Sequence, residues 1–131
     1  SVSTATTGPL DWQTFAPETI PALIADGKTV FVDVTAEWCV SCQVNKKLVL
    51  ETAELAEFFA SDDIILMQAD WTRPDPEIAD YLASYGRYGI PFNAVFGPNT
   101  PKGVLLSELL SRDAVLDAIK DARSTAGLAS N

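Results

Sequence analysis

The sequence predicts an α/β fold with a central mixed β-sheet flanked by helices on both faces. Three observations lead to this prediction. Strand-like apolar segments alternate with segments of helical periodicity along the chain. The first strong strand segment is apolar on both faces, as expected for a strand inside a sheet that is covered on both sides. The last two strand segments are separated only by a turn cluster, which adds a hairpin.

The first elements lie between residues 10 and 35. Residues 10–15 form either a short edge strand or a coil. Residues 17–26 have the pattern of a helix, with a proline at its start and Gly27 after its end. Residues 29–35 are rich in β-branched and aromatic side chains, which predicts a central strand.

A helical segment is predicted from Cys39 onwards. Val40, Val44 and Leu48 recur at helical spacing with polar residues between them, and a break follows at residues 51–52. Residues 53–60 are predicted to form a further helix.

The second half of the chain continues the alternation. Strands are predicted at residues 64–70, 92–96 and 103–106, with a helix at 77–85 that ends at Gly86. A closing helix is predicted for residues 111–126, with Ser111 as its N-cap. The expected organisation is a flexible linker (residues 1–10), one domain (11–126) and a disordered tail (127–131).

Composition excludes several classes of function. The 131 residues are 47% hydrophobic and 21% charged, which is typical of a globular domain. Nine basic residues against eighteen acidic ones leave a net charge of −9, which argues against a nucleic-acid binder. The chain has no histidine, which excludes catalytic triads that use histidine and metal sites with histidine ligands. No apolar run reaches the length of about 20 residues that spans a bilayer.

The only two cysteines, Cys39 and Cys42, form a C-x-x-C motif with four interpretations. A structural disulfide closing so short a loop would add only about 2 kcal/mol of stability. A zinc site would need two further ligands, as from a second chain. Two thiolates are also suited to Cu(I). A redox dithiol is the usual interpretation of C-x-x-C beside a βαβ pattern.

The predicted position of the motif favours the redox interpretation. Cys39 stands where a central strand ends and a helix begins, and the free N–H groups and dipole of a helix N-terminus stabilise a thiolate. Cys39 is therefore the expected nucleophile. Cys42, one helical turn further on, is expected to resolve a mixed disulfide by attacking Cys39.

Asp33 lies within an apolar strand, six residues before Cys39. It either pairs with Lys28 or a backbone N–H, or is a buried carboxyl near Cys42 that exchanges protons with the thiols. Glu37 is expected to be a solvated loop residue. Trp38 is suited either to packing or to partner contact. Ile90-Pro91 is either an ordinary turn or a cis bond that leaves backbone free to pair with a partner segment.

The segment from Val32 to Cys42 resembles the active-site stretch of thioredoxins, including the aspartate six residues before the first cysteine. Gly89-Ile90-Pro91 resembles the thioredoxin cis-proline loop, and the match runs from about residue 17 to residue 123. The resemblance implies a thioredoxin-like fold. The chain differs from cytoplasmic thioredoxins at two places. It has Val40-Ser41 between the cysteines instead of Gly-Pro, and Thr35 stands where thioredoxins usually have Trp.

Trp-Cys-Val-x-Cys, followed by a longer helical insert, resembles the C-terminal periplasmic domain of DsbD-type transmembrane reductases. Residues 69–75 and 85–92 resemble the copper-sensitivity suppressor B (ScsB) branch of that group. The best-known DsbD members carry a glutamate four residues after the second cysteine, whereas this chain has Lys46. Glu37 and Lys46 are therefore candidates for tuning the thiol pKa values.

The resemblance implies a periplasmic disulfide reductase domain of an inner-membrane protein, working without cofactor or metal. A transmembrane domain of the same parent protein would supply electrons, and a periplasmic thioredoxin-like domain or protein would accept them. Trp38, Val40, Ser41, Ile90 and Pro91 are the expected partner contacts, and the isolated domain is expected to be a monomer. The Ser/Thr-rich start agrees with an excised domain.

Two other functions are kept open. One is a free-standing thioredoxin-like reductase or a disulfide oxidase. The other is a Cu(I)-binding module that uses both thiolates without catalysis, although no Met-rich or His-rich tract supports metal handling.

Overall fold

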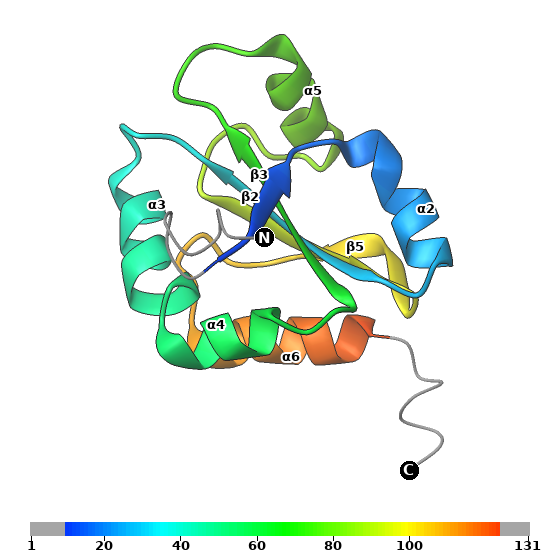
Figure 1. Ribbon diagram of the computed structural model, residues 1–131. Coiled ribbons are helices and arrows are strands. Elements are labelled where there is room, and N and C mark those ends of the chain that lie inside the picture. Colours follow the sequence, from blue (N-terminus) through cyan, green and yellow to red (C-terminus); the bar gives the residue numbers. More distant parts are fainter. Residues whose placement is uncertain (1–9, 124–131) are drawn as a thin grey trace.

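A five-stranded mixed sheet with the strand order β1-β3-β2-β4-β5 forms the centre of the computed structural model, which describes residues 10–123 (Figure 1). Strand β2 pairs in parallel with β3 and antiparallel with β4, and β3 also pairs in parallel with β1. In chain order, the elements are β1 (Trp12–Thr14), the 3-10 helix η1 (Pro17–Thr19), α2 (Ile20–Ala25), β2 (Thr29–Thr35), α3 (Val40–Asn45), the π-helix η2 (Lys46–Leu50), α4 (Ala53–Phe59), β3 (Ile64–Asp70), α5 (Pro76–Ser84), β4 (Phe92–Gly97), β5 (Thr100–Leu105) and α6 (Arg112–Ala122).

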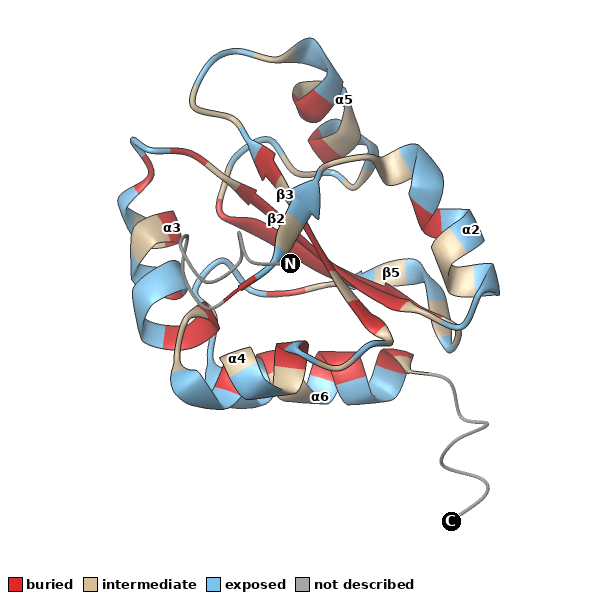
Figure 2. Ribbon diagram, in the orientation of Figure 1, coloured by how far each residue is buried: buried red, intermediate tan, exposed pale blue. Residues whose placement is uncertain are grey.

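The predicted α/β architecture is confirmed, because helices cover both faces of this sheet and two separate cores result (Figure 2). Alternate residues of β2 point to opposite faces. Phe31 belongs to the core beneath η2, α4 and α6, whereas Val30, Val32 and Val34 belong to the core beneath α2 and α5. This double burial explains why β2 is apolar on both faces.

The central strands β2 and β3 coincide with the predicted segments 29–35 and 64–70. Residues 10–15 contain the edge strand β1. The first helix begins as the 3-10 turn η1 and ends at Ala25. Gly27 follows it with a φ of 86°, a backbone conformation that favours glycine. The described part of the closing helix, α6, has Ser111 as its N-cap, as predicted.

The final hairpin differs from the prediction. Gly97 pairs with Thr100, so the turn contains only two residues, and β5 begins at Thr100 rather than at residue 103. Pro101 lies inside β5, which is possible because β5 is an edge strand that does not need every N–H for pairing.

Residues 1–9 of the predicted linker, the predicted tail (127–131) and the last three residues of the predicted closing helix lie outside the described residues. Leu10, the last residue of the predicted linker, is buried in the core that contains Phe31.

Candidate functional site

The two cysteines lie where β2 leads into α3. Cys39 is the N-cap of α3, and its Sγ accepts a hydrogen bond of 3.2 Å from the backbone N–H of Cys42. The two residues form a disulfide with a Cα–Cα distance of 5.2 Å. Helical backbone continues from Val40 through η2 to Leu50, so the N–H groups of the first turn are directed toward Cys39.

This position favours a reactive thiolate at Cys39 when the disulfide is reduced. The N–H of Cys42 and the helix dipole both stabilise negative charge on the Cys39 sulfur. Burial does not distinguish the two cysteines, because Cys39 is 6% exposed and Cys42 is 5% exposed. The difference between the cysteines is therefore their place on the helix.

The cysteines pack against Ala36 and Ile90, which belong to two different loops. The Ile90-Pro91 peptide bond is cis, as in the loop that this segment resembles. Pro91 is buried, and β4 starts at the next residue. The loop before β4 therefore lies directly against the redox pair.

Asp33 is part of a row of three polar side chains that crosses the middle of the sheet. In the strand pairing, Asp33 is in register with Gln68 on one side and with Asn93 on the other. Gln68 Nε2 donates to Asp33 Oδ2 at 3.0 Å, and Asn93 Nδ2 donates to Asp33 Oδ1 at 2.7 Å. We call this set of residues the amide row.

The amide row lies on the sheet face that α3 and η2 cover. Asp33 is two residues from Phe31, so it shares the face on which Phe31 meets Leu50 of η2. Burial raises the pKa of Asp33 above its ordinary value, while the amide donors of Gln68 and Asn93 and the charge of Lys46 act in the opposite direction. The net effect is a raised pKa.

The pairing of Asp33 with Lys28 that the sequence also allowed is absent among the described residues. Lys28 Nζ donates instead to the carbonyl of Asp62 at 3.4 Å. Asn93 Oδ1 is buried and has no hydrogen-bond partner there.

Trp38 and Glu37 contact the loop that follows β3. The Glu37 backbone N–H donates to Thr72 Oγ1 at 2.9 Å, and Trp38 Nε1 donates to the Thr72 carbonyl at 3.2 Å. The Glu37 residue is exposed, as expected, and Trp38 is 59% exposed. Trp38 is therefore anchored at its indole N–H while much of its ring faces solvent.

Val40, which is 76% exposed, and the half-buried Ser41 begin α3. Lys46 is exposed and lies 3.8 Å from Glu51 Oε2. The structure thus places Lys46 on the helical segment that covers Asp33, whereas Glu37 is tied by its backbone N–H to the loop that follows β3.

The site predicted from the residue pattern lacked Gln68 and Asn93. Both are polar residues within otherwise apolar strands, which is the signal that identified Asp33. The predicted site also lacked Asn45, which holds the segment before α6 through its Nδ2 bond to the Glu108 carbonyl and its Oδ1 bond from the Leu110 N–H. A buried asparagine on a helix is hard to identify from sequence because helix exteriors are also polar.

Among residues 10–123, no group of three or more His, Cys, Asp or Glu side chains is placed to hold a metal ion. Over the same range, no helix is both long enough and apolar enough to cross a membrane.

A family model described as thioredoxin-like matches residues 11–98. The chain is 32% identical over 79 residues to a thiol:disulfide interchange protein DsbD from Ralstonia nicotianae, covering 60% of this chain and 13% of that protein. It is 37% identical over 67 residues to a DsbD from Pseudomonas sp., covering 51% of this chain and 11% of that protein. The chain thus spans only about an eighth of the length of these curated relatives.

Solved structures have the same fold. The reduced C-terminal domain of Neisseria meningitidis DsbD superposes with a TM-score of 0.63 at 21% identity, covering 85% of this chain and all of that domain. A thioredoxin from Thermus thermophilus gives a TM-score of 0.64 at 17% identity, covering 93% of this chain and 95% of that one.

Proposed function

This chain belongs to the thioredoxin-like family, and from that premise we propose that it is a thiol:disulfide oxidoreductase domain acting as a reductase. The observation that carries the proposal is the Cys39–Cys42 pair at the junction of a central strand and a helix N-terminus, with Cys39 as the N-cap. The similarity to proteins named thiol:disulfide interchange protein supports the same chemistry.

The reaction proceeds in two exchange steps. The Cys39 thiolate attacks one sulfur of a partner disulfide, so that a mixed disulfide forms and the second partner sulfur leaves as a thiolate. The Cys42 thiolate then attacks Cys39 Sγ and releases the first partner sulfur. Two electrons pass to the partner, and the Cys39–Cys42 disulfide forms again.

Asp33 is assigned the role of proton acceptor for Cys42 in the second step. Its carboxylate is buried on the sheet face beneath α3 and η2, so it has little access to solvent protons. A raised pKa brings a carboxyl closer to the pKa of a thiol, which makes proton exchange between them more effective. Lys46 lowers the pKa of Asp33 through its charge, and Lys46 and Glu37 are the candidates for tuning the pKa values of the two thiols.

Trp38, Val40, Ser41, Ile90 and Pro91 are assigned to partner contact. Trp38 and Val40 present exposed apolar surface on either side of Cys39. Ile90 packs against the cysteines, so a partner segment beside the Ile90-Pro91 loop brings its disulfide next to the Cys39 sulfur that attacks it.

We place the domain in the periplasm, as a soluble part of an inner-membrane protein of the DsbD type. A transmembrane domain of the same parent protein is its electron donor, and a periplasmic thioredoxin-like domain or protein is its acceptor. The small share of the DsbD relatives that this chain matches supports a domain of a longer protein. The resemblance of residues 69–75 and 85–92 to the ScsB branch supports a role in copper tolerance through thiol repair.

The decisive experiment measures the Cys39–Cys42 reduction potential in glutathione or dithiothreitol buffers. Thioredoxin-like reductants lie near −270 mV, and strong oxidants of the DsbA type lie near −120 mV. A potential toward −270 mV supports a reductase. A potential near −120 mV would instead mean that the pair accepts electrons and serves disulfide formation.

A trapping experiment tests the order of attack. Cys42→Ser is expected to accumulate a mixed disulfide through Cys39, because the resolving thiol is missing. If only Cys39→Ser trapped a partner, the assignment of the nucleophile would be wrong. A stoichiometric Cu(I) complex that survives competition by glutathione would favour a copper-binding module instead.

A further inference from the structure

Three exposed apolar side chains form a stripe along the helical segment that starts at the redox pair. Val40 is 76% exposed, Val44 41% and Leu48 70%. They are spaced four residues apart, so they lie along one side of this segment. The outward side of α3 is coloured as exposed in Figure 2, while Cys42, Asn45, Val49 and Leu50 are buried on the inward side. We call Val40, Val44 and Leu48 the apolar stripe.

The apolar stripe is continuous with the reactive centre. Val40 directly follows Cys39, and Trp38, 59% exposed, precedes it. Among the described residues, only Tyr88, Val104 and Leu109 are other large hydrophobic side chains with comparable exposure. Four of these seven exposed side chains therefore lie next to Cys39 or along the helical segment that begins there, which is the distribution expected of an interaction site.

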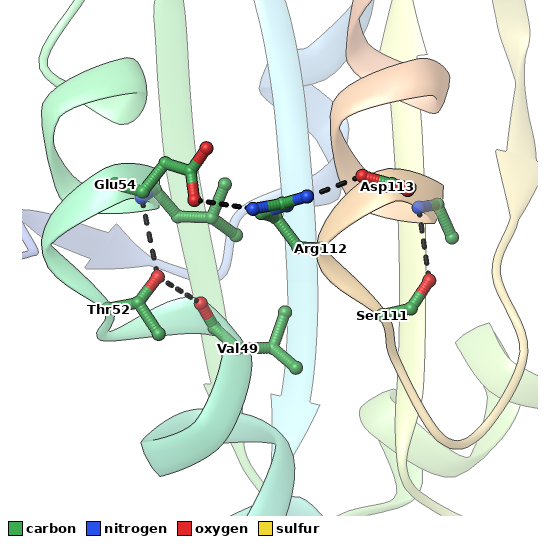
Figure 3. Close-up of polar contacts among 8 residues, drawn as sticks. Val49, Thr52, Glu54, Ser111, Arg112 and Asp113 are labelled. Atoms are coloured by element: carbon green, nitrogen blue, oxygen red, sulfur yellow. Dashed lines mark hydrogen bonds and ion pairs between the residues drawn. The ribbon is translucent and has the colours of Figure 1, made fainter.

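The surroundings of the stripe are polar. The helical segment from Val40 to Leu50 contains Lys46 and Lys47 but no acidic residue, although the chain carries a net charge of −9. Beyond Leu48 lies an open hollow of about 400 Å³, lined by Leu48, Thr52, Glu54, Ser111, Arg112 and Asp113. Figure 3 shows Arg112 between Glu54 and Asp113, so the charges in this hollow largely satisfy one another. An apolar centre with a polar rim is the usual anatomy of a protein-binding patch.

Cys39 itself offers almost no surface, since only 6% of the residue is exposed. A disulfide within a polypeptide can therefore reach Cys39 only when its chain lies closely against the neighbouring surface. Because the apolar stripe is continuous with this surface, a chain that brings its disulfide to Cys39 is also placed to contact the stripe.

We propose that the apolar stripe binds an apolar segment of the partner polypeptide that carries the exchanging disulfide, next to the partner's reactive cysteine. The proposal rests on the proposed redox function and adds a substrate preference to it. From Val40 to Leu48 the helix rises about 12 Å, at about 1.5 Å per residue. An extended chain covers that distance with about four residues. The preferred partner therefore carries apolar side chains up to about four or five residues from its cysteine.

The test compares symmetric peptide disulfides as oxidants of the reduced 131-residue chain. Each peptide has one cysteine and a flank of alternating Leu and Ser, six residues long, placed on either its N- or C-terminal side. Matched peptides replace every Leu by Ser, and a third set has a two-residue apolar flank. Hydroxyethyl disulfide serves as the small probe. Rates are measured by acid quench, alkylation and mass spectrometry.

In one of the two orientations, the peptide disulfide with the long apolar flank is expected to react about tenfold faster than its serine counterpart. Burying even one leucine side chain contributes enough free energy for at least about a tenfold change in rate. The two-residue flank is expected to lose the advantage, because it does not reach Leu48. Leu48→Ser and Val44→Ser should abolish the preference and leave the hydroxyethyl disulfide rate unchanged. Val104→Ser, which removes a partly exposed valine from β5, is the matched control and should keep the preference.

Equal rates for apolar and serine flanks would overturn the proposal, as would an unchanged preference in Leu48→Ser. Dimerisation of the chain in sedimentation velocity that disappears in Leu48→Ser would also overturn it, because a second copy would then occupy the stripe. Failure of the reductase function is distinguishable, since it would appear as a reduction potential near that of strong oxidants of the DsbA type, which the peptide flanks do not affect.

Discussion

Asn93 lies directly across from Asp33 in the antiparallel pairing of β2 with β4, and its amide Nδ2 donates to the Asp33 carboxylate at 2.7 Å. Gln68 makes the equivalent contact from the parallel neighbour β3 at 3.0 Å. Both oxygens of a buried carboxylate thus accept an amide hydrogen bond. This arrangement offsets part of the cost of burying the charge and keeps the carboxyl from becoming a much weaker acid.

Removing the amide of Asn93 is expected to raise the pKa of Asp33. In Asn93→Leu the carboxylate loses its shorter hydrogen bond, which should increase its proton affinity about tenfold. A carboxyl ¹³C NMR titration of Asp33 measures this directly. Gln68→Leu should act in the same direction, and the double variant should exceed either change. An unchanged titration in both single variants would contradict the role of the amide row.

Asp33→Asn is expected to stabilise the domain at neutral pH. The folded-state pKa of Asp33 is raised, so the folded state binds the proton more tightly than the unfolded state. Wild-type stability therefore falls as pH rises from the ordinary aspartate pKa, about 3.9, through the folded-state value. The variant avoids this loss and should therefore be more stable than the wild type at pH 7.

The amide introduced by Asp33→Asn also finds a hydrogen-bond partner. Asn93 Oδ1 has no partner at present among the described residues, so a rotation of the Asn93 amide by half a turn lets this oxygen accept from the new N–H₂ group. Urea unfolding of the oxidised proteins at pH 7 and pH 3.5 measures the gain, which should disappear at the lower pH. The same variant should exchange disulfides more slowly near neutral pH. Equal exchange rates between pH 6 and pH 9 would limit Asp33 to a structural role.

Reversing the charge at Lys46 is expected to raise the pKa of Asp33. Lys46 at present lowers that pKa through its charge, so Lys46→Glu replaces an attraction with a repulsion. Lys46→Glu also places a carboxylate near Glu51, with which Lys46 now pairs. Lys47→Glu is the matched control, because Lys47 is not among the groups that shift Asp33. Equal effects of the two variants in the NMR titration would exclude a specific influence of position 46.

Gly97→Ala is expected to destabilise the packing of α6 against β4. A Cβ at residue 97 would overlap the backbone carbonyl of Ala122 in α6, and neither backbone can move without shifting its element. The expected loss is about 1 to 3 kcal/mol in the free energy of unfolding, measured with urea. Gly89→Ala is the control, because its added methyl group meets nothing within 4 Å and the backbone there is not left-handed. Equal stability of the two variants would show that α6 adapts freely.

Periodicity predicted the helix after Cys39 but did not indicate which side of it is buried. Val40, Val44 and Leu48 recur at helical spacing, and so do Cys42, Asn45, Val49 and Leu50. The structure buries the second set and exposes the first. Two helical stripes of similar apolarity are equivalent as local patterns, and only packing against the sheet distinguishes them.

The sequence by itself determined the central strands, the alternation of strands and helices, and the position of Cys39 at the end of a strand, because side-chain periodicity and the junction of strand and helix are local properties. The amide row and the outward direction of the apolar stripe were decided only by the tertiary structure. Asp33, Gln68 and Asn93 are far apart in the chain and meet through the register of three strands. Register depends on the total burial of both sheet faces, which no short segment of sequence contains.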